Sequence, residues 1–341
     1  MRAVRLHGYG QRPAVEDVAE PEVSGPHDVI VRVGGAGLCR TDLHIIEGQW
    51  RDKSGVSLPY TLGHENAGWV QAVGPAVEHV GVGDTVIVHP LVTCGHCRAC
   101  RAGDDMHCSA STFPGIDADG GFAELLRTGA RSVVKLDPSV RPQDVAALAD
   151  AGLTAYHAAR KAGAILHPGT YALVLGAGGL GHIGVQSLKA LTAATVIVVD
   201  PSRDALELAR ASGADHTVVG AADHVSEVLE LTGGHGCEAV LDFVGEGGAI
   251  EDGIAMLRRA GTYYVIGYGG TLRVPAIDII SSEINFVGNL VGTYNDLVEL
   301  MSLTAQGRVA LRTRTYPLAD ANDAMDDLEH GRLPGRGILI P

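Results

Sequence analysis

Hydrophobic residues in the second half of the chain form short runs and helical periods that alternate with one another. The apolar runs 171–175 and 193–200 predict two buried strands, and the segment 180–191 between them predicts a helix. Further helices are predicted at 205–212, 249–257, 294–307 and 319–328, and further strands at 239–245, 261–267, 285–292 and 337–340. Strands that alternate with helices in this way indicate an α/β fold with a doubly wound parallel sheet.

The first third of the chain follows a different pattern, in which short apolar stretches are separated by turns that contain Gly and Pro. Residues 1–35 read as short strands, and 29–33 alternates apolar and charged positions as a half-buried strand does. Further strands are expected at 69–73, 82–88 and 119–126. The segment 146–162 predicts a helix. Two patterns within 341 residues suggest two domains.

The turn after the first strand of the α/β half has the spacing G-x-G-x-x-G. Gly176 permits a tight turn, Gly178 lets a pyrophosphate approach the backbone, and Gly181 lets the helix pack against its strand. The motif also contains Gly179 and Leu180. An αβ turn without a ligand is the alternative. The order of strand, turn, helix and strand favours a dinucleotide, whose phosphates bind at the helix N-terminus.

An acidic residue at the end of the second strand indicates which dinucleotide is bound. Asp200 follows the motif by about 20 residues and can accept hydrogen bonds from the adenosine ribose, which favours NAD over NADP. Arg203 is able to pair with a 2′-phosphate, so the preference is not absolute. Parallel sheets bind ligands at the carboxyl ends of their strands. Four residues near such ends are therefore expected to line the groove: Val244, Ile266, Gly267 and Val291.

Charge and composition exclude several classes of function. The net charge of −14 and the small aromatic content, with 2 Trp, 4 Phe and 9 Tyr, argue against nucleic-acid binding. No apolar run approaches the ~18 residues of a membrane span. The N-terminus has the alternation of a strand and lacks the pattern of a signal peptide. We therefore expect a cytoplasmic protein.

Four of the 6 cysteines lie close together in the sequence, with the spacing C-x2-C-x2-C-x7-C. They are Cys94, Cys97, Cys100 and Cys108. Four thiolates at this spacing can enclose a tetrahedral zinc ion, and a closed set of four cysteines is structural because it leaves no position for a substrate. Four free thiols on one loop and an iron–sulfur cluster are the alternatives.

A second set of potential ligands is spread over the first half of the chain. Cys39 taken alone is a typical buried small residue, and a histidine beside a glutamate, as at His64 and Glu65, is usually structural. Asp150 lies among Ala, Gly and Leu, so its carboxylate needs a partner, either a nearby backbone amide or a metal. Cys39 and His64 with one acidic residue would form the three-ligand site of a catalytic zinc.

These features together resemble the zinc-dependent, medium-chain alcohol dehydrogenases over essentially the whole chain. The resemblance rests on the stretch 39–44, on Gly63-His64-Glu65, on the four cysteines, on Asp150 and on the glycine motif, in that order. It implies a catalytic domain built on a partly open, GroES-like β-barrel at 1–151 and 291–341, with a structural zinc lobe at about 90–112. A Rossmann cofactor domain at 152–290 is implied between the two parts.

The resemblance also implies two zinc ions per chain, NAD as cofactor, and roles for individual residues. The residue that matches Arg40 contacts the pyrophosphate, and the one that matches Glu65 neighbours the catalytic zinc and approaches it transiently. The one that matches Thr41 takes the substrate proton, which passes by the nicotinamide ribose hydroxyl to the position of His44. The sequence departs from the family pattern at Asp150, where many members have a second cysteine and some bacterial members have aspartate.

The expected reaction is reversible hydride transfer between a primary, secondary or aryl alcohol and NAD, at a zinc held by Cys39, His64 and Asp150. A polyol or threonine dehydrogenase on the same scaffold is the alternative. The ligand trio argues against the zinc-free quinone reductases of the superfamily. The intact ligands and proton relay argue against a silent NAD-binding protein such as the lens crystallins recruited from it.

Two further expectations concern the end of the chain. Arg336 lies in a Gly-flanked turn, where it either reaches a phosphate or is solvated. The apolar strand 285–292 ends the cofactor sheet and is able to pair with its copy in a second subunit. Because bacterial members of the family are often tetramers, the resemblance implies a homotetramer assembled as a dimer of dimers.

Overall fold

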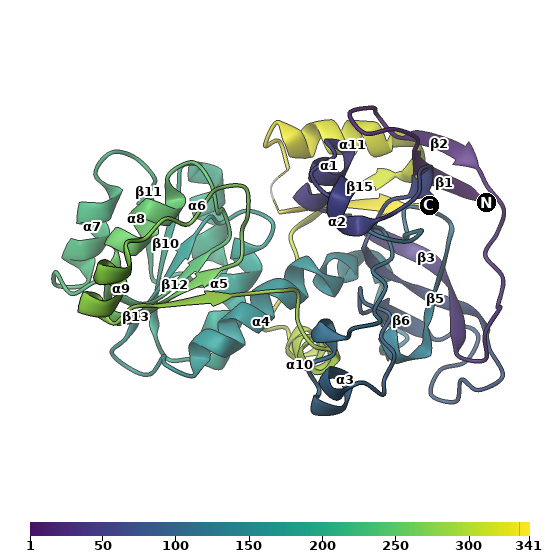
Figure 1. Cartoon of the computed structure of the whole chain (residues 1–341), viewed down its shortest axis with the longest axis horizontal. Helices are drawn as coiled ribbons and strands as arrows, with labels where there is room; N and C mark the ends of the chain where they lie inside the picture. The colour runs from purple at the N-terminus through teal and green to yellow at the C-terminus, as the bar shows by residue number, and fades with distance from the viewer. Residues whose placement is uncertain (334) are drawn as a thin grey trace. The chain divides into compact units, whose positions relative to one another are not determined.

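The computed structural model describes residues 1–333 and 335–341, which form two compact units (Figure 1). The first unit consists of Met1–Ala151, Thr293–Glu299 and Leu311–Pro341, and the second consists of Gly152–Gly292 and Leu300–Ala310. One segment differs from the expectation that 291–341 returns wholly to the first domain. Residues 300–310 pack with the second unit, because Leu300 and Val309 are buried there and Gln186 exchanges hydrogen bonds with the backbone of Ala310.

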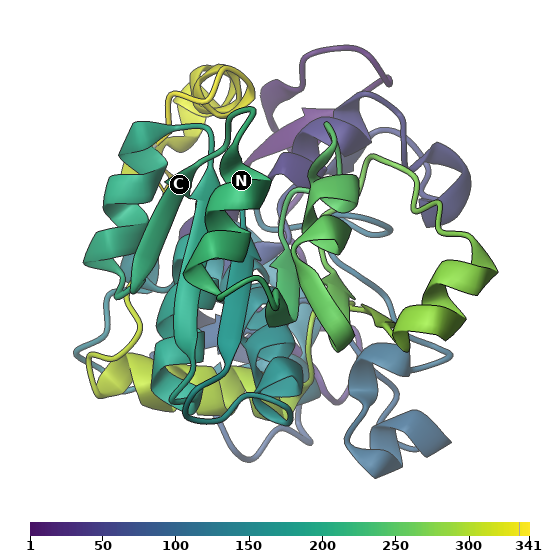
Figure 2. The same cartoon turned by 90° about the vertical axis from the view of Figure 1, so that its left-hand side faces the viewer.

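The second unit contains a parallel sheet of six strands in the order β11-β10-β9-β12-β13-β14 (Figure 2). The strands are β9 (Tyr171–Leu175), β10 (Thr195–Asp200), β11 (His216–Val219), β12 (Cys237–Asp242), β13 (Leu257–Val265) and β14 (Asn285–Gly288). The first strand, β9, lies in the middle, and the chain moves outward from it in both directions. This arrangement confirms the predicted doubly wound sheet.

Helices cover both faces of this sheet, because successive side chains of each strand point to opposite sides. Ala172 and Val174 of β9 pack in one cluster with α4, α5 and α6, while Leu173 and Leu175 pack in another with α7 and α8. The helices are α4 (Ala151–Gly163), α5 (Gly181–Leu191), α6 (Arg203–Ala211), α7 (His224–Leu231) and α8 (Ala249–Ala255). Burial on both faces explains why these strands read as continuous apolar runs in the sequence.

The first unit is built on two sheets whose strands are mostly antiparallel. One has the order β2-β1-β4, and the other has the order β15-β16-β3-β5-β6-β8, with β7 also paired to β3. The strands are β1 (Arg2–Leu6), β2 (Ala14–Asp17), β3 (Asp28–Leu38), β4 (Tyr60–Thr61), β5 (Glu65–Val73), β6 (Thr85–Val88), β7 (Leu125–Gly129), β8 (Val133–Lys135), β15 (Thr313–Pro317) and β16 (Arg336–Ile340). The α-helices of this unit are α1 (Arg40–Ile46), α2 (Arg51–Ser54), α3 (Arg98–Ala102) and α11 (Ala321–Glu329). The helix α9 (Ala276–Ser282) belongs to the second unit, and α10 (Tyr294–Ala305) begins in the first unit and ends in the second.

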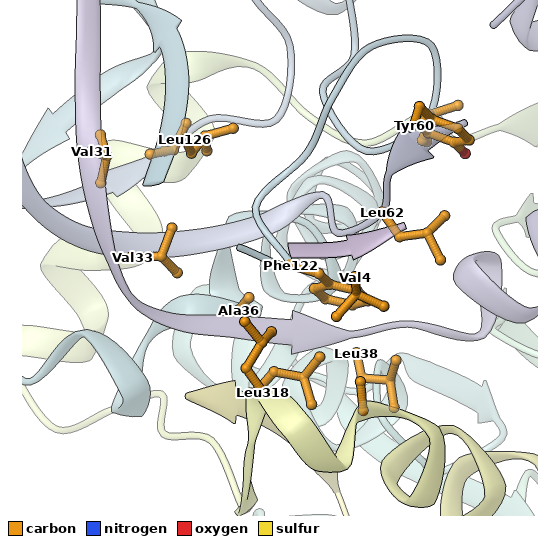
Figure 3. Close-up of a cluster of buried hydrophobic side chains, with 14 of the residues drawn as sticks. Val4, Val31, Val33, Ala36, Leu38, Tyr60, Leu62, Phe122, Leu126 and Leu318 are labelled. Atoms are coloured by element: carbon orange, nitrogen blue, oxygen red, sulfur yellow. The ribbon is translucent and has the colours of Figure 1, made fainter. Parts of the chain in front are cut away.

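The strand β3 is longer and more buried than its alternating pattern predicts. Its neighbours β5, β7 and β16 pair with different parts of it, and Val31 and Val33 enter the main core of the unit (Figure 3). Arg32 is the exposed residue of the predicted stretch, and its guanidinium stacks over the ring of Trp69 at 4.2 Å from the centroid. The strand predicted at 29–33 is therefore present, but it is more than half-buried, since Arg32 is its only exposed position.

The predicted helix at 146–162 is interrupted at Asp150. A 3₁₀ turn spans Ala146–Ala149, and α4 begins only at Ala151. The backbone N–H of Ala151 donates to Glu65 Oε1 at 3.1 Å, so it is satisfied by a side chain from β5 in place of a helical carbonyl. Asp150 thus lies at the junction between the two helical segments, where a carboxylate from β5 accepts the first N–H of α4. None of the helices within 1–333 and 335–341 is long and apolar enough to cross a membrane.

Candidate metal centres and cofactor site

The structure brings together four potential metal ligands that are far apart in the sequence. Cys39 lies between β3 and α1, His64 and Glu65 lie at the start of β5, and Asp150 lies at the junction before α4. One ligand atom from each of these residues lies within 4.8 Å of the others. A thiol, an imidazole and carboxylates in such a cluster are the ligand types that bind zinc.

The ring of His64 lies between two carboxylates, one of which faces each of its nitrogens. Nδ1 lies 3.3 Å from Oδ1 of Asp42, and Nε2 lies 3.4 Å from Oδ2 of Asp150. Asp42 also accepts the backbone N–H of Cys39 at 2.9 Å, so one fully buried carboxylate contacts two of the candidate ligands. A carboxylate behind Nδ1 favours the tautomer that leaves the lone pair of Nε2 directed at the other ligands.

The buried atoms of this cluster fit a cation. His64 Nε2 is buried without a well-formed hydrogen bond to any of the described residues, and its distance to Asp150 is long for one. Burial lowers the pKa of His64, but the Asp42 carboxylate and the contacts with Asp150 and Cys39 outweigh burial and raise that pKa well above its usual value. The Asp42 carboxylate faces Nδ1 and the Asp150 carboxylate faces Nε2, so this negative charge would be partly neutralised by a zinc ion bound on the Nε2 side.

Glu65 is held beside these ligands by partners from two other segments. Its Oε1 accepts hydrogen bonds from the Arg336 guanidinium and from the N–H of Ala151. Its Oε2 is buried without a hydrogen-bond partner in the described chain. A β-carbon at Gly37 would lie 2.0 Å from Oε2, so the glycine is required for the carboxylate to fit. Burial raises the pKa of Glu65, and the positive charge of Arg336 opposes that shift.

The environment of Arg336 differs from the expectation of an exposed turn. Arg336 is the first residue of β16 and is 3% exposed, and its guanidinium pairs with Glu65. The prediction that Arg336 is solvated is therefore wrong. The guanidinium is buried, and the carboxylate of Glu65 balances its charge. A contact with a cofactor phosphate remains a prediction.

The predicted proton-relay and phosphate residues follow Cys39 on α1. Arg40 is exposed, Thr41 is partly buried and His44 is buried, all within the first turns of this helix. The sequence analysis assigned no role to Asp42, which lies between them. Its position three residues after Cys39, where a helix N-terminus favours an acid, is the signal that identifies it.

The second candidate centre is formed by the four cysteines, in a loop that includes α3. The Sγ atom of Cys94 lies 3.5 Å from the Sγ of Cys108 and 4.0 Å from the Sγ of Cys100. The Sγ atoms of Cys97 and Cys100 are 3.5 Å apart. Tetrahedral zinc with ordinary Zn–S bonds separates its sulfur ligands by about 3.8 Å. The cluster therefore has the dimensions of a closed zinc site.

Backbone amides direct the protonation of these thiols. The N–H of Cys97 donates to Cys94 Sγ at 3.4 Å, and the N–H of Cys94 donates to Cys108 Sγ at 3.4 Å. Backbone N–H groups lower the pKa of Cys97 to about 6 and lower that of Cys94, while burial raises the pKa of Cys100 to about 11. Thiolate is the form that binds metal, so the loop is partly prepared for it at neutral pH.

The glycine motif lies at the carboxyl end of β9, where it leads into α5. Gly176 has a φ of +84°, and a β-carbon at Gly181 would lie 1.8 Å from the carbonyl oxygen of Gly176. A β-carbon at Gly178 would have no neighbour within 4 Å, so the backbone there is open to a ligand. These positions need glycine for the three different reasons that the motif predicts.

The other predicted cofactor residues lie at the same edge of the sheet. Asp200 ends β10, and its carboxylate accepts the N–H of Ala177 and the N–H of Ser202, each at 2.8 Å. Arg203 begins α6 nearby and is exposed. Val244 and Ile266 follow β12 and β13, and Val291 follows β14 with a φ of +46°. Asp200 thus shapes the glycine turn in addition to its expected contact with the ribose.

Both the sequence and the structure of the chain are similar to those of known alcohol dehydrogenases. The family described as "Alcohol dehydrogenase GroES-like domain" matches residues 25–138, and "Zinc-binding dehydrogenase" matches residues 179–306. The NAD-dependent alcohol dehydrogenases of Sulfurisphaera tokodaii and Saccharolobus solfataricus are 35% and 36% identical, and each alignment covers 100% of both chains. The crystal structure of the alcohol dehydrogenase from Aeropyrum pernix superposes with a TM-score of 0.98 at 48% identity, again over 100% of both chains.

Proposed function

Because the chain belongs to the zinc-dependent, medium-chain alcohol dehydrogenases, we propose that it catalyses reversible hydride transfer between an alcohol and NAD. The product is an aldehyde or a ketone. The observation that carries this proposal is the convergence of Cys39, His64 and Asp150 in one buried cluster. These three ligands leave a fourth position for a substrate, as a catalytic zinc requires.

Each group of residues has a defined task in this proposal. When bound, zinc acts as a Lewis acid on the alcohol oxygen, and NAD is the hydride acceptor. Cys39, His64 and Asp150 would hold the metal, and Asp42 fixes the ring of His64. The glycine motif and Asp200 would bind the cofactor. The second centre, with its four cysteines, would hold a structural zinc and contribute to folding.

The proton of the alcohol leaves by way of α1 in the proposed reaction. Thr41 is proposed to take it, and the proton then passes by the nicotinamide ribose hydroxyl to His44 and to solvent. Arg40, exposed at the start of the same helix, is proposed to contact the cofactor pyrophosphate. Glu65 is proposed to approach the metal during ligand exchange, since its Oε2 is buried next to the three ligands without a partner among the described residues.

A substrate panel tests the proposal and separates it from its alternatives. Primary, secondary and benzylic alcohols are incubated with the zinc-loaded protein and NAD, and NADH absorbance is followed. We expect turnover with at least one of these classes. Faster turnover of a polyol or of threonine would assign the chain to those branches of the family instead. Binding of NADH without turnover of any substrate would indicate the silent, crystallin-like alternative.

We also propose a cytoplasmic location. The four-cysteine cluster supports a cytoplasmic location, because cysteine thiols that bind zinc must stay reduced and the cytoplasm keeps them so. Fractionation of cells that express the chain, followed by detection in the soluble and secreted fractions, tests the location. Recovery of the protein mainly outside the cell would contradict it.

A further inference from the structure

A fully buried carboxylate closes the end of β12 in the cofactor unit. Oδ2 of Asp242 accepts the hydroxyl of Tyr263 at 2.6 Å. Oδ1 accepts the N–H of Val244 at 2.8 Å and the N–H of Gly245 at 2.9 Å. Burying a carboxylate is costly unless its oxygens are satisfied, and here three donors satisfy them. Asp242 therefore fixes the path of the chain directly after the strand.

The main chain of the same residue fixes a second loop. The carbonyl oxygen of Asp242 accepts the N–H of Ile266 at 3.2 Å and that of Gly267 at 2.8 Å, which follow β13. The two loops are in direct backbone contact, since a β-carbon at Gly245 would lie 2.3 Å from Gly267. Side chain and main chain of Asp242 thus hold both loops in one arrangement.

These loops adjoin the glycine motif. The N–H of Phe243 donates to the carbonyl oxygen of Leu175, the last residue of β9. A β-carbon at Gly176 would lie 2.7 Å from Val244 Cγ2, and one at Gly184 of α5 would lie 2.8 Å from the ring of Phe243. The position of the loop after β12 therefore depends on contacts with the motif on one side and with Asp242 on the other.

The sheet topology indicates which part of the cofactor the two loops would face. The strand order reverses between β9 and β12, and dinucleotides bind across such a switch point with one half on each side. The glycine motif and Asp200, on the side of β9 and β10, are suited to the pyrophosphate and the adenosine. The loops after β12 and β13 are on the other side, which corresponds to the nicotinamide half.

We propose that Asp242 is a positioning residue, which sets the loops 243–245 and 266–267 for the nicotinamide half of NAD. This inference rests on the proposed function and assigns Asp242 no contact with the reacting atoms. Asn at this position keeps the shape and an acceptor oxygen but loses the charge, which weakens the hydrogen bonds from Val244 and Gly245. Asp242→Asn should therefore weaken binding of ligands that carry nicotinamide and spare those that lack it.

Calorimetric titration without alcohol measures the Kd for a ligand that carries nicotinamide and for one that lacks it. NADH carries both halves of the cofactor, whereas ADP-ribose lacks the nicotinamide. We expect Asp242→Asn to raise the Kd for NADH by about tenfold, the difference between a charge-assisted and a neutral hydrogen bond, and the Kd for ADP-ribose by less than about threefold. A purely structural role for Asp242 would shift both values by the same factor.

The matched control is Glu238→Gln, on the opposite end of the same strand. Glu238 accepts the N–H of Tyr171 at 2.7 Å, so it also holds a neighbouring segment through a carboxylate. Its substitution should lower thermal stability and leave the ratio of the two Kd values unchanged. If Asp242→Asn does not fold, Tyr263→Phe is used instead, because it removes the hydroxyl that donates to Asp242. The ratio of the Kd for NADH to the Kd for ADP-ribose should then rise by about threefold.

Two results overturn the inference. Equal losses for NADH and ADP-ribose, or no loss for NADH in a folded Asp242→Asn or Tyr263→Phe variant, would show that Asp242 serves only stability. A wild-type chain that binds neither ligand would overturn the proposed function as well. Normal wild-type binding with an unchanged ratio would overturn this inference alone.

Discussion

Single residues shape the first candidate metal centre, which Cys39, His64, Glu65 and Asp150 form. Asp150 interrupts a helix that its sequence neighbourhood favours, and its carboxylate lies next to His64 and Cys39. The N–H of Ala151, which a capping side chain would normally satisfy, is taken by Glu65. The placement therefore supports the metal-ligand role over the helix-start role, and mutagenesis separates the two.

Asp150→Asn tests that role. If Asp150 only satisfies local polar groups, the variant should lose about 1 kcal/mol of stability and keep its activity. If it is the third ligand, a neutral amide replaces an anion, so the catalytic zinc should bind more weakly and kcat should fall by orders of magnitude, with partial recovery in excess zinc. Zinc content and kcat with a good alcohol are measured together.

The control for this experiment is Asp150→Cys. Thiolate is a good zinc ligand, so this variant should retain zinc. Two zinc ions and near-normal turnover in Asp150→Asn would mean that the third ligand lies elsewhere. Glu65 would then be the next candidate, because it belongs to the same cluster.

Asp42→Asn tests the carboxylate behind His64. The variant loses the charge that faces Nδ1 and weakens the hydrogen bond from the N–H of Cys39. We expect the affinity of the catalytic site for zinc to fall by roughly 10–100-fold, the effect typical of outer-shell partners. Competition with a chelator measures it. Asp28→Asn is the control, since Asp28 accepts the N–H groups of Ser24 and Gly25 in a separate loop, and an equal loss there would contradict the prediction.

Asp200→Gly tests the choice of cofactor. The wild-type chain should have a higher kcat/KM with NAD than with NADP, because the carboxylate repels a 2′-phosphate. The variant should narrow that difference and lower both values, since it also loses the acceptor for Ala177 and Ser202. Equal kcat/KM values for the two cofactors in the wild-type chain would contradict the preference.

At the scale of elements, the four-cysteine loop contains little regular secondary structure. It contains α3, of five residues, and a single 3₁₀ turn at Asp105–His107, which are too short to be stable alone. Outside the sulfur cluster, the Asp105 carboxylate accepts the N–H of Tyr294 at the start of α10. A metal in this loop therefore acts mostly on folding.

Cys97→Ser should remove the structural zinc and leave the catalytic site intact. Elemental analysis should give two zinc ions in the wild-type chain and about one in the variant, with a large loss of thermal stability and a smaller loss of kcat. Cys237→Ser is the control, because Cys237 is buried outside both clusters. It should lose some stability and no zinc. One zinc ion or none in the carefully purified wild-type chain would contradict the two-site interpretation.

At the scale of the whole molecule, the cofactor sheet has an edge to which no further strand pairs among residues 1–333 and 335–341. The strand β14 is the last in the order, and it is shorter than the predicted 285–292. Apolar side chains are exposed in the same region of the second unit, with Ile277 at 66%, Ile280 at 71% and Leu290 at 51%. An unpaired strand edge beside exposed apolar residues is typical of a surface that associates.

We therefore expect pairing of β14 with its copy and assembly into a homotetramer, as a dimer of dimers. Light scattering at micromolar concentration should give four chains. Ile280→Asp should shift the population toward smaller species, because it would bury a charge in the contact. Val82→Asp is the control, since Val82 is 72% exposed in the other unit. A monomeric wild-type chain would refute the assembly.

The sequence by itself determined the features that depend on neighbours along the chain. The alternation of apolar runs and helical periods predicted the doubly wound sheet, and the requirement for glycine at Gly176 and Gly181 could be read from the motif. The cysteine spacing predicted a compact four-thiol cluster. In each case the physical constraint acts within a few residues, so the pattern is visible without the fold.

Only the tertiary structure decided features that depend on contacts between distant segments. Where the helix is interrupted at Asp150, the N–H of Ala151 donates to Glu65 from β5, and the buried Arg336 pairs with the same carboxylate. The contact of Asp42 with His64 and the loops held by Asp242 likewise join separate elements. Local propensity cannot predict them, because the free energy that stabilises them comes from partners that the folded chain alone brings together.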